Sequence, residues 1–117
     1  CPFDHSIDAR LTLAEQRLAA GLVDETDFDA ERLGRTGEQV LEWLHANLPE
    51  TGDTIVTHGD ACTPNILAVD GRFSGIVDCG RLGTADVWQD LAIACRSIRD
   101  NIGKEHIAPF LAAYGAV

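Results

Sequence analysis

Apolar residues in the first half of the chain follow a helical spacing. They recur every three or four positions from residue 7 to residue 22, as in a helix that buries one face. Gly21 favours a helix end at that point. A second helix is predicted from Thr36, because Thr36 and Gln39 have the spacing of a capping box, and Pro49 marks its end.

Between residues 54 and 77 the pattern changes to short apolar runs. Residues 54–57 are one strand candidate, and residues 66–69 and 72–77 flank the pair Asp70-Gly71. An Asp-Gly pair between two such runs is a strong hairpin signal, because a tight turn needs positive φ at both positions. We therefore predict a β-hairpin in the middle of the chain.

Two further helices are predicted after this hairpin. The first starts at the cap residue Asp86 and carries apolar side chains along one side as far as Ile102, and the second runs from Ile107 almost to the end. The predicted fold class is α+β: mostly helical with a small hairpin, and with too few strands for a doubly wound sheet. Because 117 residues leave room for one core, we expect one compact unit.

The charge of the chain restricts its partners. Nineteen acidic and nine basic residues give a formal net charge of −10. Such a surface repels phosphate backbones, so we expect no nucleic-acid partner. It would attract a cationic ligand, although solubility alone also accounts for an acidic surface. No apolar run approaches the roughly 20 residues of a membrane helix, so no membrane partner is expected.

Cysteine usage and the chain start bear on localisation. The four cysteines include no CxxC pair and no spacing suited to zinc, which favours free thiols in a reducing cytoplasm. The first residues, Cys1 to His5, do not have the pattern of a signal peptide, and the chain contains no Met. We therefore expect a cytoplasmic protein whose sequence continues upstream of Cys1.

Candidate chemistry is concentrated around the predicted hairpin. His58, Asp60 and Asn65 lie between the first strand and the hairpin, and Asp78 follows the hairpin. Loops at strand ends can converge on one point, where Asp60 could accept a proton from a hydroxyl nucleophile. Asn65 and Asp78 could supply hard oxygen ligands to Mg²⁺. A single Asp beside Gly is usually only a turn residue, but the joint spacing of these three favours catalysis.

These residues carry a family resemblance. The pattern HxDxxxxN, followed by a hairpin and DxG, resembles the catalytic and metal-binding loops of the protein-kinase-like fold. The segments VTHGDAC (residues 56–62) and GIVDCGRLG (residues 75–83) are similar to aminoglycoside 3′-phosphotransferases, and the similarity covers nearly the whole chain. The resemblance implies the C-terminal lobe of such a kinase over residues 1–117, with Mg²⁺ and ATP or GTP as phosphate donor.

The resemblance also implies residue roles. Asp60 would be the catalytic carboxylate, Asn65 and Asp78 would hold Mg²⁺, and His58 would brace the catalytic loop. An aminoglycoside carries several ammonium groups, so its site should be rich in carboxylates. The substrate-binding candidates are Asp29, Glu31, Arg81, Arg96 and Asp100.

Several of these assignments have alternatives. Arg81 and Arg96 could be ion-pair partners in an acidic chain, and the acidic stretch of residues 24–31 could be a solvated face. Ala30 and Ser97 occupy positions where the resemblance implies acidic residues.

The resemblance also implies parts that the sequence does not contain. There is no G-x-G-x-x-G loop and only one lysine, Lys104, so we expect the N-terminal nucleotide lobe and the extreme C-terminus to be absent and the chain to be inactive alone. Two alternatives remain: a kinase of another small alcohol, and a non-catalytic remnant that binds a polycation or a partner chain.

Overall fold

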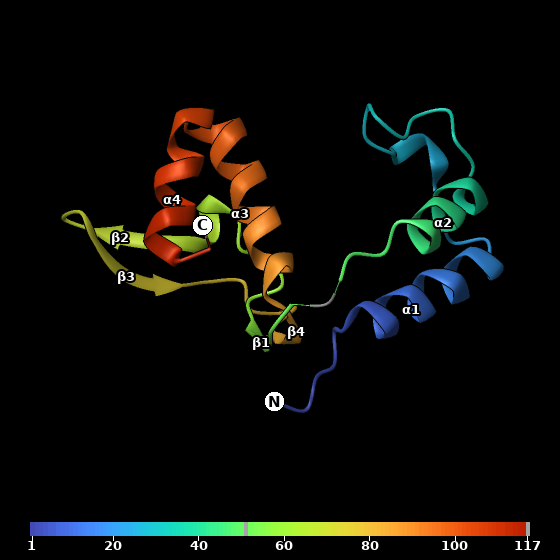
Figure 1. Cartoon of the computed structure of the whole chain (residues 1–117), viewed down its shortest axis with the longest axis horizontal. Coiled ribbons are helices and arrows are strands. Elements are labelled where there is room, and N and C mark those ends of the chain that lie inside the picture. The colour runs from blue at the N-terminus through green and yellow to red at the C-terminus, as the bar shows by residue number, and fades with distance from the viewer. Residues whose placement is uncertain (51, 117) are drawn as a thin grey trace. The chain divides into compact units, whose positions relative to one another are not determined.

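The computed structural model describes residues 1–50 and 52–116, which form two compact units (Figure 1). The helical unit is His5–Thr51, and the mixed unit is Cys1–Asp4 with Gly52–Val117. The expectation of a single compact unit is therefore wrong.

The α-helices are α1 (Ile7–Ala19), α2 (Gly37–Ala46), α3 (Val87–Asn101) and α4 (Ile107–Tyr114). The strands are β1 (Thr54–Thr57), β2 (Ile66–Val69), β3 (Arg72–Ile76) and β4 (Gly83–Asp86), and the 3-10 turns are η1 (Glu25–Asp27), η2 (Thr63–Asn65) and η3 (Lys104–His106).

Local capping signals set the starts of both helices in the helical unit. Ser6 caps α1, its hydroxyl accepting from the amide of Ala9. At α2 the Thr36 hydroxyl accepts from the Gln39 amide at 3.2 Å, and the Gln39 side chain accepts from the Thr36 amide at 3.0 Å. The predicted capping box is therefore confirmed, and α1 and α2 pack against each other within this unit.

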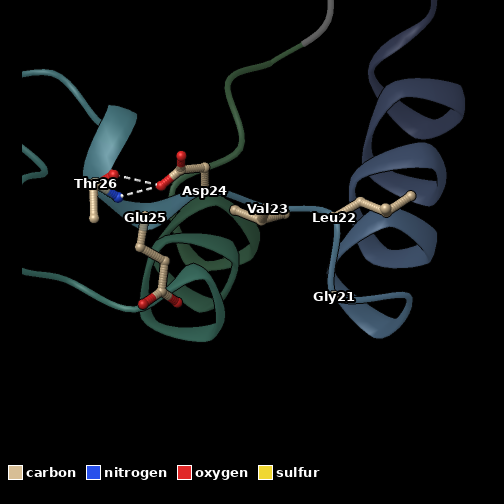
Figure 2. A pocket seen from close by; sticks show the side chains of 6 residues that line it. All are labelled: Gly21, Leu22, Val23, Asp24, Glu25 and Thr26. Atoms are coloured by element: carbon tan, nitrogen blue, oxygen red, sulfur yellow. Dashed lines mark hydrogen bonds between the residues drawn. The ribbon is translucent and has the colours of Figure 1, made fainter.

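Carboxylates hold the segment between α1 and α2. Figure 2 shows Asp24 accepting hydrogen bonds from the hydroxyl and the amide of Thr26, at 2.6 and 2.9 Å. These two bonds hold the pKa of the Asp24 carboxyl below its usual value. The Glu25 carboxylate accepts from the amide of Gly37 at 2.6 Å, at the positive end of α2. Asp24 and Glu25, in the acidic stretch of residues 24–31, therefore stabilise the local structure of the helical unit.

The predicted hairpin is present in the mixed unit. β2 and β3 pair antiparallel with Val69 opposite Arg72, and Asp70 and Gly71 make the turn with φ of 50° and 72°. Positive φ at both positions is what a two-residue turn of this kind requires. β3 ends at Ile76, one residue before the predicted end.

A second antiparallel pair, β1 with β4, joins distant parts of the mixed unit. Thr54 lies opposite Asp86 and Thr57 opposite Gly83. The sequence predicted β1 but not β4. The Thr57 hydroxyl, almost fully buried, donates to the carbonyl of Gly83 at 3.0 Å.

The core of the mixed unit lies along α3. Its buried apolar side chains are Ala85, Leu91, Ala94 and Ile98. Asp86 caps the helix as predicted, accepting from the Trp88 amide at 2.8 Å, and α4 packs beside α3 (Figure 1). Among the described residues, no helix has the length and apolar character needed to cross a membrane.

Candidate active site

The loop between β1 and η2 carries His58 and Asp60. The His58 ring nitrogen Nε2 lies 2.8 Å from the carbonyl oxygen of Val77, and Nδ1 accepts from the Asp60 amide at 3.3 Å. Together these bonds need the neutral ring with its proton on Nε2. The imidazole thus connects the backbone of Asp60 to the residue that precedes Asp78.

Asn65 connects the same loop to the hairpin. Its side chain is buried, and Nδ2 donates to the Asp60 carbonyl at 3.0 Å. The Val77 amide donates to the Asn65 carbonyl at 3.0 Å, which continues the β2–β3 pairing beyond Ile66 and Ile76. Because Asp78 follows Val77, the two predicted metal ligands lie at the same end of the hairpin.

Asn65 and Asp78 supply two oxygen ligands of the kind that Mg²⁺ prefers. The Asp78 side chain is exposed, and its backbone is in the left-handed region with φ 58°, which Asp tolerates better than most residues. Within residues 1–50 and 52–116, no group of three or more His, Cys, Asp or Glu side chains could hold a metal ion. An amide and a carboxylate nevertheless fit Mg²⁺, which is usually bound by one or two carboxylates together with water and phosphate oxygens.

Gly59 brings the two loops into contact. Its φ is 82°, and a Cβ atom built there would lie 2.2 Å from the carbonyl oxygen of Arg81. Any side chain at residue 59 would therefore push the loop that carries Asp60 away from the loop that carries Asp78. Arg81 itself is exposed.

Sequence reasoning gave no role to Asp90, which anchors this loop. Its carboxylate accepts from the amides of His58 and Gly59 at 2.6 and 2.9 Å. Asp90 is half-buried in the first turns of α3. In the sequence, Asp90 stands in the segment QDLA (residues 89–92), which belongs to the family resemblance, and a carboxylate close to the start of a helix is ordinarily explained by the helix dipole.

The predicted substrate-binding residues belong to different units. Arg96 and Asp100 lie one turn apart on α3 and are exposed. A hydrogen bond of 2.8 Å from Arg99 lowers the pKa of the Asp100 carboxyl, which favours its ionised form.

Arg81 also belongs to the mixed unit, whereas Asp29 and Glu31 lie in the helical unit. The Asp29 carboxylate pairs with the guanidinium of Arg32. Glu31 lines a small pocket with Arg32, Arg35 and Trp43. Asp29 is therefore engaged in an ion pair within its own unit.

The arrangement of strand, loop, hairpin and following helix is that of the protein-kinase-like fold of aminoglycoside phosphotransferases. The structure superposes with a TM-score of 0.83 on a crystal structure of an aminoglycoside-3′-phosphotransferase of type VIII, at 38% identity, covering 99% of this chain and 45% of that one. It superposes with a TM-score of 0.73 on a Streptomyces rimosus aminoglycoside phosphotransferase in complex with ADP and streptomycin, at 27% identity, covering 97% of this chain and 47% of that one.

The chain belongs to the phosphotransferase enzyme family, which matches it over residues 1–117. It is 41% identical to an aminoglycoside 3′-phosphotransferase of Streptomyces fradiae, over 99% of this chain and 46% of the relative. It is 46% identical to an Escherichia coli aminoglycoside 3′-phosphotransferase, over 80% of this chain and 34% of the relative. The chain thus spans less than half the length of these curated relatives. The family predicted from the sequence is confirmed.

Proposed function

We propose that this chain is the C-terminal part of a cytoplasmic aminoglycoside phosphotransferase, which transfers the γ-phosphate of ATP or GTP to an antibiotic hydroxyl and so confers resistance. One observation carries the proposal: hydrogen bonds tie Asp60 both to Asn65 and, through His58, to the residue before Asp78. The proposed base Asp60 and the proposed metal ligands Asn65 and Asp78 therefore lie in one network of hydrogen-bonded loops. The aminoglycoside 3′-phosphotransferases among its relatives support the same reaction.

Each residue of this framework has a separate role in the proposed reaction. Asp60 orients the attacking hydroxyl and takes its proton. Asn65 and Asp78 would hold Mg²⁺, which when bound neutralises charge on the nucleotide phosphates. His58 does not transfer protons, because both of its ring nitrogens are occupied by backbone groups.

Each unit carries its own candidates for contact with the acceptor. Aminoglycosides are polycations, and exposed carboxylates suit their ammonium groups. In the mixed unit the candidates are the exposed Asp100, Arg81 and Arg96. In the helical unit they are the exposed Glu31 and Asp29, and the Asp29 carboxylate also pairs with Arg32.

The nucleotide lobe would come from the rest of a longer protein. This part of the proposal is supported by the share of the relatives that the chain covers, which is 46% for the Streptomyces fradiae enzyme. The hairpin also exposes large apolar side chains, with Val69 61% and Phe73 72% exposed, which the nucleotide lobe would cover in this proposal.

The test is phosphate transfer to kanamycin and neomycin by the complete protein, with and without Mg²⁺. Asp60→Asn should lower turnover by at least ~10²-fold with little change in folding, because the amide cannot accept the proton. Asp70→Asn is the matched control: the same change in a hairpin turn, where Asn also tolerates positive φ, should leave turnover unchanged.

Two results would contradict the proposal. Near-normal turnover in Asp60→Asn would remove the assignment of the base. No transfer to any aminoglycoside by a folded complete protein would favour another small alcohol as acceptor, or a role in binding alone.

A further inference from the structure

A second anchor holds the far end of the loop that carries the candidate catalytic residues. Thr63 begins η2, and its backbone amide donates to the hydroxyl oxygen of Ser97 at 2.9 Å. The hydroxyls of Thr63 and Ser97 also lie 2.9 Å apart, within hydrogen-bond distance. Ser97 is buried, with 8% of its surface exposed. Its hydroxyl is therefore engaged by the loop residue Thr63.

Asn101 fixes this hydroxyl from the next turn of α3. Its Nδ2 donates to the carbonyl and to the hydroxyl of Ser97, at 2.9 and 3.1 Å. It also lies 3.5 Å from the Thr63 hydroxyl. Three polar side chains thus form one closed cluster where η2 meets α3. Closed clusters of this kind restrict the rotamers of their members.

The two anchors of the loop lie on one face of α3. Asp90 and Ser97 are seven residues apart, which is two helical turns and about 10 Å along the axis. Asp90 accepts from the amides at the start of the loop, and Ser97 accepts from the amide of Thr63 near its end. One rigid helix therefore sets the span of the loop from His58 to Asn65.

We propose that Ser97 is a positioning residue for the metal ligand Asn65. Asn65 is the last residue of the η2 turn that Thr63 begins, and its amide donates to the Cys62 carbonyl at 3.0 Å. Holding Thr63 in place therefore also holds the backbone of Asn65, and with it the side-chain amide that would bind Mg²⁺. This inference rests on the proposed function, in which Asn65 holds Mg²⁺.

The experiment uses the complete protein with ADP and Mn²⁺, whose binding is followed by electron paramagnetic resonance. Ser97→Ala should weaken Mn²⁺ binding about 10-fold, as loss of a group that orients a metal ligand does. The affinity for kanamycin should stay within about twofold of the unchanged protein. Amide exchange at Thr63, measured without metal, should become faster.

Three further variants separate the contributions of the cluster. Thr63→Val keeps the backbone bond to Ser97 and should weaken Mn²⁺ binding less than Ser97→Ala. Asn101→Ala, at an exposed position, keeps the Ser97 hydroxyl and should also give a smaller effect; it replaces Ser97→Ala if that variant does not fold. Ser74→Ala, exposed on β3, is the matched serine control and should leave Mn²⁺ binding unchanged.

Specific outcomes overturn the proposal. The proposal is wrong if Ser97→Ala folds and changes neither the Mn²⁺ affinity nor the amide exchange at Thr63. If Ser97→Ala does not fold, unchanged Mn²⁺ affinity in Asn101→Ala overturns the proposal instead. Equal losses of Mn²⁺ and kanamycin affinity would instead show general loosening of the structure. If the unaltered protein with ADP binds no Mn²⁺, the metal assignment of the proposed function falls, and this inference falls with it. Transfer to a different alcohol would overturn only the proposed acceptor and would leave the role of Ser97 intact.

Discussion

Gly59 combines two backbone constraints that can be measured separately. Its φ of 82° is unfavourable for any residue with a Cβ atom, and the space for that atom is filled by the backbone of Arg81. Gly71 has a similar φ of 72° but no atom within 4 Å of a built Cβ. Substitutions at Gly71 and Gly59 therefore separate the cost of backbone strain alone from the cost of strain together with a steric clash.

We predict that Gly71→Ala lowers the free energy of unfolding by about 1–2 kcal/mol, which is the strain of a left-handed residue. Gly59→Ala should cost a further roughly 1–3 kcal/mol because it also overpacks the contact with Arg81. Urea unfolding of both variants measures the difference. Equal losses would show that the two loops do not meet as tightly as the structure has them.

The sequence pattern predicted some of the candidate site residues but missed others. His58, Asp60, Asn65 and Asp78 were found because their spacing is a pattern along the chain; their roles stay predictions. Asp90 and Ser97 were assigned no function because they act on backbone amides of a distant loop. No pattern along a sequence shows which amide a distant side chain will bind.

Helix starts are the elements that the sequence predicted best. The signals for Thr36 and Asp86 involve residues within three positions of one another, so they do not depend on the rest of the fold. The hairpin was predicted for the same reason. β4 was missed because its pairing depends on β1, and Thr57 lies opposite Gly83, 26 residues further along the chain.

The capping box of α2 gives a prediction at the scale of the element. Thr36→Ala removes the bond to the Gln39 amide and should destabilise α2 by about 1 kcal/mol. Thr12→Ala is the matched control, because Thr12 is an exposed residue within α1 that bonds the Asp8 carbonyl. It should be neutral or slightly stabilising, since Ala has the higher helix propensity. Circular dichroism during thermal unfolding measures both variants, and equal effects would contradict the capping role.

The division of the chain into compact units differs most from what the sequence predicted. One compact unit was expected from chain length alone, yet the chain divides into a helical unit and a mixed unit. Apolar spacing shows that a helix has a buried face but does not show what covers it. α1 contains no buried residue, whereas α3 contains the fully packed Leu91, Ala94 and Ile98.

This difference predicts unequal stability within the chain. In residues 1–117 alone, amides of α3 should exchange with solvent more slowly than amides of α1, because opening α3 exposes the only closely packed apolar group that the structure describes. Hydrogen exchange followed by mass spectrometry gives the rates for both helices. Equal protection of α1 and α3 would mean that the chain unfolds as one cooperative body.

The two anchors on α3 also limit how genes for such chains can diverge. Substitutions between Asp90 and Ser97 leave both anchors on one face, so residues there can change where packing and the proposed substrate contact of Arg96 allow. Deletion of one codon there would rotate Ser97 by about 100° around the helix axis, away from Thr63. A frame-preserving loss of one residue in this segment should therefore be far rarer among functional descendants than replacement of its exposed residues outside the proposed site.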